Sequence, residues 1–217
     1  MADLLRKEFK LALHPTAIIF LALSAMMLIP NYPYYVIFFY TGLAVFFICL
    51  SARENNDVVF SMMLPTEKGE IVKARILMAV LLETAQLVIA VPFAVIRQNM
   101  DMPGNQAGMD ANISLFGLSL IMLGIFNYSF FRAYYKDIKK VGTAFVKAST
   151  LVFVYMAIAE TCDHAVPFFK NVLDTPDPMY ITHKLIVLAV GIAVFVVLTL
   201  AVCRKAAESF EGSDIQM

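Results

Sequence analysis

Residues 51–75 read SARENNDVVFSMMLPTEKGEIVKAR, a polar stretch in a chain that is otherwise mostly apolar. Asn56 and Asp57 are favourable helix-capping residues, and Pro65 ends a helix because it has no N–H to donate. These signals predict a short helix over residues 58–64. Helical spacing places an apolar patch on one face of this helix, made of Val59, Met62 and Met63, with Phe60 beside it. We therefore expect the stretch to offer a small, adaptable apolar surface to a partner protein.

The composition is that of a membrane protein. Hydrophobic residues make up 60% of the 217 residues, charged residues make up 16%, and the mean hydropathy is +0.75. A soluble domain of this length is less apolar, and a chain with a single membrane anchor carries far fewer apolar segments. The sequence therefore predicts an all-α polytopic membrane protein, with residues 1–217 forming one transmembrane domain.

Six apolar segments are candidates for membrane spans, because about 20 apolar helical residues cross the hydrocarbon core. A basic amphipathic segment that suits the membrane interface precedes the first apolar segment. No small-residue cleavage site follows this first apolar segment, so we expect it to be a retained span and not a cleaved signal peptide. We divide the domain into an interfacial helix (1–14), spans 1 and 2 (15–50), a cytoplasmic stretch (51–75), spans 3 and 4 (76–131), a cytoplasmic loop (132–140), spans 5 and 6 (141–203) and a cytoplasmic tail (204–217).

Basic residues set the predicted orientation. Of the 17 lysines and arginines, only Arg97, Lys170 and Lys184 fall on one set of alternate connections, which leaves fourteen on the other. Short connections rich in lysine and arginine stay in the cytoplasm. We therefore expect both termini to be cytoplasmic.

The two longer outer connections differ in character. Residues 97–112 are rich in Asn, Gly and Met and contain Pro103, which predicts an irregular loop. Residues 161–180 instead carry an approximate apolar stripe, formed by Val166, Phe169, Val172 and Leu173. We expect this second segment to be re-entrant, lying on or dipping into the outer leaflet.

Few residues are candidates for catalysis, metal binding or ligand binding, and each also has an ordinary structural explanation. Glu83 lies about two turns inside the third span, where a carboxylate marks either a functional site or a hydrogen bond between helices. Residues 160–164 include metal-ligand types, but a polar outer loop explains them too, and we expect no metal site. Aromatic residues of the second span are compatible with packing or with a ligand path. The hypothetical translocation path comprises Tyr35, Phe39, Tyr40, Phe47 and Glu83.

No phosphate-binding glycine loop and no hydrolase or metalloprotease motif is present in the sequence. We therefore expect no catalytic residue and no cofactor on this chain. Active transport would need energy from another subunit, and residues 51–75 are where such a subunit could bind.

Four motifs resemble those of a known family. Short six-span permeases of the type 2 exporter class of ABC transporters begin with a basic amphipathic segment like LLRKEFKLAL. They continue with an acidic, asparagine-containing segment, a Leu-Pro element and a helix start like EIVKARIL. In this chain these correspond to residues 54–57, to Leu64 with Pro65, and to residues 70–77. The chain is most similar to bacterial permeases that export amphipathic peptides, including the phenol-soluble modulin exporters.

The resemblance implies a coupling helix over residues 58–64 and a re-entrant segment over residues 161–180. It also implies a second permease chain, which we expect to be identical, and two copies of an ABC ATPase subunit that bind ATP and Mg²⁺. The expected membrane is the bacterial cytoplasmic membrane, the expected substrate is an amphipathic or hydrophobic peptide, and no nucleic acid is involved. The residues expected to contact the ATPase are Glu54, Asp57, Val58, Val59, Phe60, Met62, Met63 and Leu64.

Two other classes of function stay open at this point. A membrane scaffold or immunity protein could bind a toxin without ATP. An intramembrane enzyme would need a catalytic pair at membrane depth, for which Glu83 offers one member. A neighbouring gene for an ATPase would favour the transporter.

Overall fold

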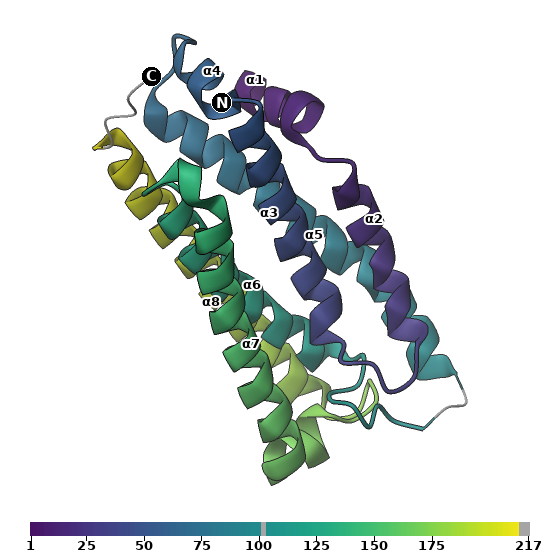
Figure 1. The fold of residues 1–217 in the computed structure, drawn as a ribbon. Helices are drawn as coiled ribbons and strands as arrows, with labels where there is room; N and C mark the ends of the chain where they lie inside the picture. Colours follow the sequence, from purple (N-terminus) through teal and green to yellow (C-terminus); the bar gives the residue numbers. More distant parts are fainter. Residues whose placement is uncertain (101–102, 213–217) are drawn as a thin grey trace.

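The computed structural model describes residues 1–100 and 103–212. The described chain is helical and contains no strand, which confirms the all-α prediction (Figure 1). In chain order the elements are α1 (Ala2–Lys7), the π-helix η1 (Glu8–Ala12), α2 (Thr16–Ala22), the 3₁₀ helix η2 (Leu23–Leu28), α3 (Tyr35–Glu54), α4 (Asp57–Met62), α5 (Lys68–Asn99), α6 (Ile113–Tyr134), η3 (Ile138–Lys140), α7 (Val141–Ala165), η4 (Phe169–Leu173) and α8 (Ile181–Glu211).

Within the described residues, five helices are long and apolar enough to cross a membrane, namely α3, α5, α6, α8 and α7 together with η3. The first predicted span corresponds to α2 with η2. These follow α1 and η1 after a bend of 89°. At a rise of about 1.5 Å per α-helical and 2.0 Å per 3₁₀ residue, α2 with η2 is about 22 Å long. The bend gives α1 and η1 the orientation expected of an interfacial helix.

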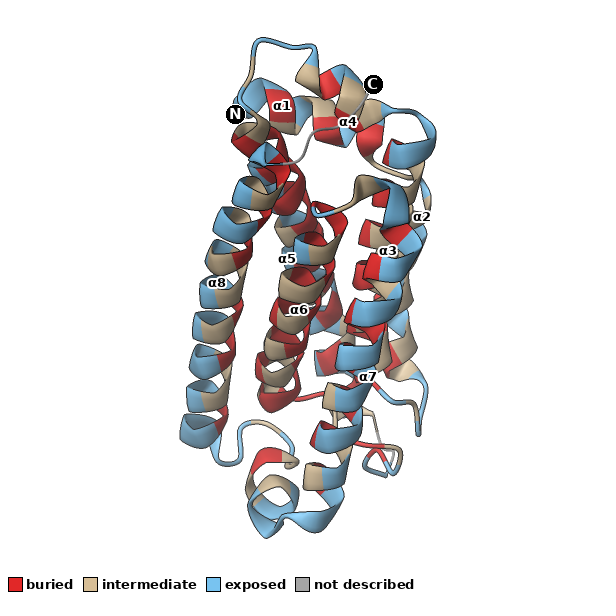
Figure 2. Cartoon of the chain, turned by 60° about the vertical axis from the view of Figure 1, so that its left-hand side comes forward, coloured by how far each residue is buried: buried red, intermediate tan, exposed pale blue. Residues whose placement is uncertain are grey.

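The helices form two groups, which meet where α3 packs on α6 and α7 and where α5 packs on α8, with α6 packed against α7 and α8. Helices α2, α3 and α5 lie on one side and α7 and α8 on the other, while α1, α4 and the C-terminal end of α8 share one end of the bundle (Figure 1). Helix α5 is tilted, so that Gly69 at its start packs near Ala207 of α8, whereas Gln86 bonds to Ser24 in η2. The outward sides of α7 and α8 are exposed and apolar, as surfaces in contact with lipid should be (Figure 2).

Helices α6 and α8 make the most extensive pairing, and two glycines make it possible. A Cβ atom placed on Gly191 would stand 2.1 Å from the carbonyl oxygen of Gly117, and one placed on Gly117 would stand 2.8 Å from the backbone of Leu188. Small residues let membrane helices approach backbone to backbone, which strengthens their packing. The close crossing therefore fixes α6 and α8 as one unit.

The two outer connections differ in their structure. Residues 97–99 of the predicted loop are still helical and end α5, whereas residue 100 and residues 103–112 form no helix or strand; residues 101–102 lie outside the description. In residues 161–180, however, α7 continues to Ala165, and the apolar side chains then pack inward. Leu173 is buried, while Phe169 and Val172 pack against the main core. Three of the four predicted stripe residues thus pack toward the protein, while Val166 is exposed, and the re-entrant position stays a prediction.

Two helices extend beyond the predicted spans at the opposite end. Helix α5 begins at Lys68, so residues 68–75 of the polar stretch are already part of it. Helix α8 runs through the predicted tail to Glu211, with Phe210 buried against Tyr135, and residues 213–217 lie outside the described chain. The extension of α5 packs against α4, and the extension of α8 packs against the start of α5.

Candidate functional site

Helix α4 connects α3 to α5 and is shorter than the sequence predicts. It spans Asp57–Met62 instead of residues 58–64, and Met63 is its C-cap. Asn56 occupies the N-cap in a left-handed conformation, with φ of 51°, and its side chain makes no capping hydrogen bond. Because asparagine tolerates the left-handed region better than most residues, it permits the tight turn from α3 into α4.

The exposed apolar face of α4 also differs from the prediction. Val58 and Ser61 are buried against the protein, and Val59 and Met62 are half-buried. The side chains of Phe60 and Met63 are 56% and 69% exposed, and Leu64 is 36% exposed. Helical periodicity explains the change, since Met62 stands one turn after Val58 and follows it inward. The outward patch therefore consists of Phe60, Met63 and Leu64, and this set is called the α4 patch below.

A cluster of four charged residues holds α4 in place. Arg75 in α5 is almost fully buried and forms ion pairs with both Glu8 and Asp57. The ammonium of Lys7 lies 2.5 Å from an oxygen of Asp57 and 3.2 Å from an oxygen of Glu8. Lys7 also donates to the hydroxyl of Ser61 in α4, at 2.7 Å. We call Lys7, Glu8, Asp57 and Arg75 the four-charge cluster.

The four-charge cluster has no formal net charge, and it links the N-terminal helix, α4 and α5. Buried charges are tolerated when each is paired, and removing one partner leaves another uncompensated. Asp57 therefore positions α4 from the inside, while Glu54 is exposed and pairs with its neighbour Arg53. Of the eight residues predicted to contact an ATPase, Phe60, Met63, Leu64 and Glu54 are exposed for that role.

The five hypothetical path residues have different neighbours. Tyr35 is buried in the main core, and Phe39 contacts Phe145 and Phe153 of α7. Two others, Tyr40 and Phe47, instead stack on a ring of α2, that of Phe20. Phe39 therefore lies on one side of α3, and Tyr40 and Phe47 lie on another. The fifth residue, Glu83, belongs to a separate contact between α5 and α6.

Glu83 is fully buried and accepts a hydrogen bond of 2.8 Å from the side-chain amide of Asn127 in α6. One carboxylate oxygen of Glu83 and the amide oxygen of Asn127 have no hydrogen-bond partner among the described residues. One turn along α5, Gln86 donates to Ser24 at 2.9 Å. These contacts join α5 to α6 and to η2 at membrane depth. They agree with the structural explanation of Glu83, a hydrogen bond between helices.

We expect Glu83→Gln to preserve or slightly raise stability. The glutamine side chain can accept from Asn127 and donate to the unpartnered amide oxygen, and each such bond contributes about 1 kcal/mol. Thermal unfolding in detergent measures this, with Glu83→Leu as the control that leaves Asn127 unpartnered and costs about 1–3 kcal/mol. If Glu83→Gln folds normally but transport is lost, the charge itself matters; if both are unchanged, Glu83 is structural.

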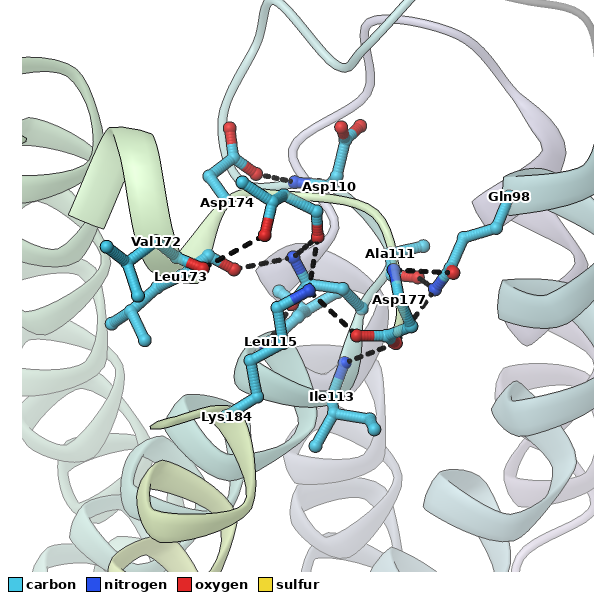
Figure 3. Close-up of polar contacts among 12 residues, drawn as sticks. Gln98, Asp110, Ala111, Ile113, Leu115, Val172, Leu173, Asp174, Asp177 and Lys184 are labelled. Atoms are coloured by element: carbon cyan, nitrogen blue, oxygen red, sulfur yellow. Dashed lines mark hydrogen bonds and ion pairs between the residues drawn. The ribbon is translucent and has the colours of Figure 1, made fainter. Parts of the chain in front are cut away.

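The opposite end of the bundle is closed by a second polar cluster (Figure 3). Lys184 at the start of α8 is fully buried and donates to Asp177 at 2.8 Å and to the carbonyl of Thr175 at 2.5 Å. Asp177 also accepts from the backbone N–H of Ile113 and from Gln98, both at 3.2 Å. The contacts join the ends of α5, α6 and α8. Lys184 was predicted only as one of three outer charges, so its burial was missed.

Asp174 ties the two outer connections together within the same cluster. Its carboxylate accepts from the backbone N–H of Asp110 at 2.6 Å, and the side chain of Asn112 donates to the carbonyl of Leu173 at 2.8 Å. Burial raises the pKa of the Asp174 carboxyl to about 7, despite the opposing hydrogen bond from Asp110. The loop before α6 and the segment before α8 therefore form one layer.

An apolar cavity of about 290 Å³ lies beneath this layer, between α5, α6 and α8. Its walls include Leu87, Val91, Phe116 and Leu188, and its polar end is formed by Gln98 and Asp177. Sequence reasoning did not identify it, because its lining comes from three helices that are far apart along the chain. A cavity with apolar walls and one polar end suits an amphipathic molecule.

A family model described as ABC-2 family transporter protein matches residues 3–205. Neither a curated protein nor a solved structure matches the chain. The family match agrees with the multi-pass helical architecture, and the family implies an ATPase partner. Because the match runs from the N-terminal helix into α8, the protein belongs to the ABC-2 transporter family and is a permease subunit of an ABC exporter.

Proposed function

We propose that this permease works as a homodimer with two ATPase subunits and exports amphipathic or hydrophobic peptides across the bacterial cytoplasmic membrane. The observation that carries the proposal is the α4 patch, three apolar side chains exposed on a short helix and at its C-terminal end, outside the spans. Phe60 and Met63 have no membrane to contact there if the predicted orientation holds. A groove in an ATPase would bury them, while ATP and Mg²⁺ bind to that partner.

The four-charge cluster supplies the mechanical link that such coupling needs. A displacement of α4 by the ATPase acts on Asp57, and through Arg75 and Lys7 it acts on α5 and the N-terminal helix. Rigid-body movement of packed helices can then change access from one side of the membrane to the other. On this proposal α4, α1 and the C-terminal end of α8 face the cytoplasm.

The proposed substrate class rests on the nature of the spans. The largest buried polar side chains of α5 at membrane depth bond to neighbouring helices, Glu83 to Asn127 and Gln86 to Ser24. A single bundle therefore offers little polar lining for a hydrophilic path. A cleft between two copies, with apolar cavities such as the one beside Phe116, suits a peptide that has an apolar face.

The test of this proposal is the double substitution Phe60→Asp with Met63→Asp. Both side chains point away from the permease, so we expect the variant to insert and to keep its own melting temperature. It should lose the co-expressed ATPase on purification, and export with it, because the partner's groove would have to bury unpaired carboxylates. Truncation of central interface anchors commonly costs about 2 kcal/mol or more, and a charge costs more still.

Two matched variants make the outcome readable. Phe60→Leu with Met63→Leu keeps the α4 patch apolar and should retain the ATPase. Met62→Asp places a charge on the half-buried side of the same helix and should destabilise the permease itself. A folded aspartate double variant that still holds the ATPase in normal stoichiometry and still exports would refute the coupling role of α4.

A further inference from the structure

Three metal-ligand side chains gather at the outer end of α7. Glu160, Asp163 and His164 are three and four residues apart, which brings them to one face of the last helical turns. One ligand atom from each lies within 4.8 Å of the other two. None of these three residues belongs to the four-charge cluster or to the contact between α5 and α6 at Glu83. The group therefore has no role in the proposed coupling.

Each carboxylate of this group has one buried oxygen without a hydrogen-bond partner among the described residues. Asp163 is only 5% exposed, and its Oδ1 atom has no hydrogen-bond partner in the described part of the chain. The Oε2 atom of Glu160 is likewise buried without one. Among the described residues no lysine or arginine forms an ion pair with either side chain. Because an unpartnered buried carboxylate is costly, a bound cation would stabilise both groups.

The imidazole of His164 is oriented as that of a metal ligand often is. Its Nδ1 atom lies 2.9 Å from the carbonyl oxygen of Glu160. With the proton on Nδ1 the ring donates to that carbonyl, and a metal bound at Nε2 would take the place of the ring's contact with the backbone of Gln106. Metal-bound histidines usually donate their other N–H to a carbonyl or carboxylate in this way.

The loop before α6 covers the group from above. Gly108 has a φ of 156°, and a Cβ atom on it would stand 1.9 Å from Oε2 of Glu160, so only glycine allows the loop to come this close. On the other side, an open cavity is lined by Glu160, Thr161, His164 and Ala165. The Gly108 loop limits the space around the carboxylates, and the open cavity leaves room for a water ligand.

We propose that Glu160, Asp163 and His164 bind one divalent transition-metal ion of the zinc type. Zinc accepts imidazole and carboxylate ligands and is often held by three side chains and a water molecule, whereas calcium prefers six to eight oxygen atoms. Ligand atoms around a tetrahedral zinc ion lie about 3.3 Å apart. Small side-chain rotations at the end of α7 would close the present spacing.

A metal at this position would cross-link residues of one helix directly beneath the loop that Gly108 belongs to. It would hold the Glu160 carboxylate in the place where that loop packs on it. The expected consequence is a more stable outer layer when the ion is bound.

The test uses the full-length protein, purified in detergent, stripped with a chelator and titrated with zinc chloride by calorimetry. We expect one zinc ion per chain, with X-ray absorption showing one imidazole among nitrogen and oxygen ligands. His164→Ala should weaken binding by more than the roughly 10-fold loss that follows removal of an outer-shell partner. The matched control is His183→Ala, which removes another exposed outer histidine and should leave zinc affinity unchanged.

A second variant checks the carboxylates without changing their shape. Glu160→Gln with Asp163→Asn should also lose zinc binding, while its melting temperature without metal stays equal to or above that of the unaltered protein. Zinc binding that is absent, that survives in His164→Ala, or that His183→Ala removes equally would overturn the proposal. Calcium binding that matches zinc in affinity and ignores His164 would overturn the zinc assignment.

Discussion

Arg75→Met is expected to lower the free energy of unfolding by about 3–5 kcal/mol, one of the two largest single-residue effects expected for this protein. Arg75 is 2% exposed and is the ion-pair partner of both Glu8 and Asp57. Methionine preserves much of the side-chain volume, so the loss arises from charge. It leaves a buried carboxylate without compensation, and breaking buried pairs in this way costs several kcal/mol.

Unfolding in detergent by heat or denaturant measures the effect, and Arg53→Met is the matched control. Arg53 pairs with Glu54 at the surface, where an ion pair contributes about 0–1 kcal/mol. The sign of the change in unfolding free energy that Glu8→Gln causes gives a sharper check. Alone it should destabilise the protein, but in the Arg75→Met background it should stabilise it, because it removes the unpaired charge. Equal losses in both backgrounds would show that the four-charge cluster is not an energetic unit.

Gly191→Ala is the second substitution for which we expect a large effect. The added methyl group would stand 2.1 Å from the carbonyl oxygen of Gly117, and backbone cannot move aside as a flexible side chain can. Helices α6 and α8 must separate, which costs about 3 kcal/mol, at the upper end of the usual range for overpacking. The melting temperature in detergent and the yield of folded protein should both fall.

Gly142→Ala is the control for this substitution. No atom lies within 4 Å of the position that its Cβ would take at the start of α7. Alanine is also the better helix former, by up to about 1 kcal/mol. We therefore expect Gly142→Ala to be neutral or slightly stabilising. A Gly191→Ala variant that is as stable as Gly142→Ala would mean that α6 and α8 do not cross as closely as described.

The long spans were predictable because their signal is local. About 20 consecutive apolar residues identify a spanning helix wherever its neighbours are, and α3, α6 and α7 coincide closely with the predicted segments. Helix ends were not predictable from this signal. The polar first turns of α5 and the last turns of α8 are stabilised by packing on each other, as between Gly69 and Ala207, and hydropathy does not report such contacts.

The candidate site was predictable in place but not in detail. The capping and proline signals located α4, yet its rotation depends on Val58 and Ser61 fitting the protein surface, which six residues of sequence do not specify. The pairing of Glu8 with Arg75 spans 67 positions and has no local signature. One signal was available, because Arg75 stands one turn after Ile71 and so falls on the apolar side of α5.

The short first span has a consequence for the lipids around it. At about 22 Å, α2 with η2 is about 8 Å shorter than an average hydrocarbon core of about 30 Å. Such hydrophobic mismatch is relieved when the bilayer thins locally, at a cost of fractions of a kcal/mol per Å. Tilting cannot make up the missing length, because a tilted helix reaches less far across the hydrocarbon core. The membrane is therefore expected to be thinnest beside α2, and membranes of shorter acyl chains should accommodate this protein with the least deformation.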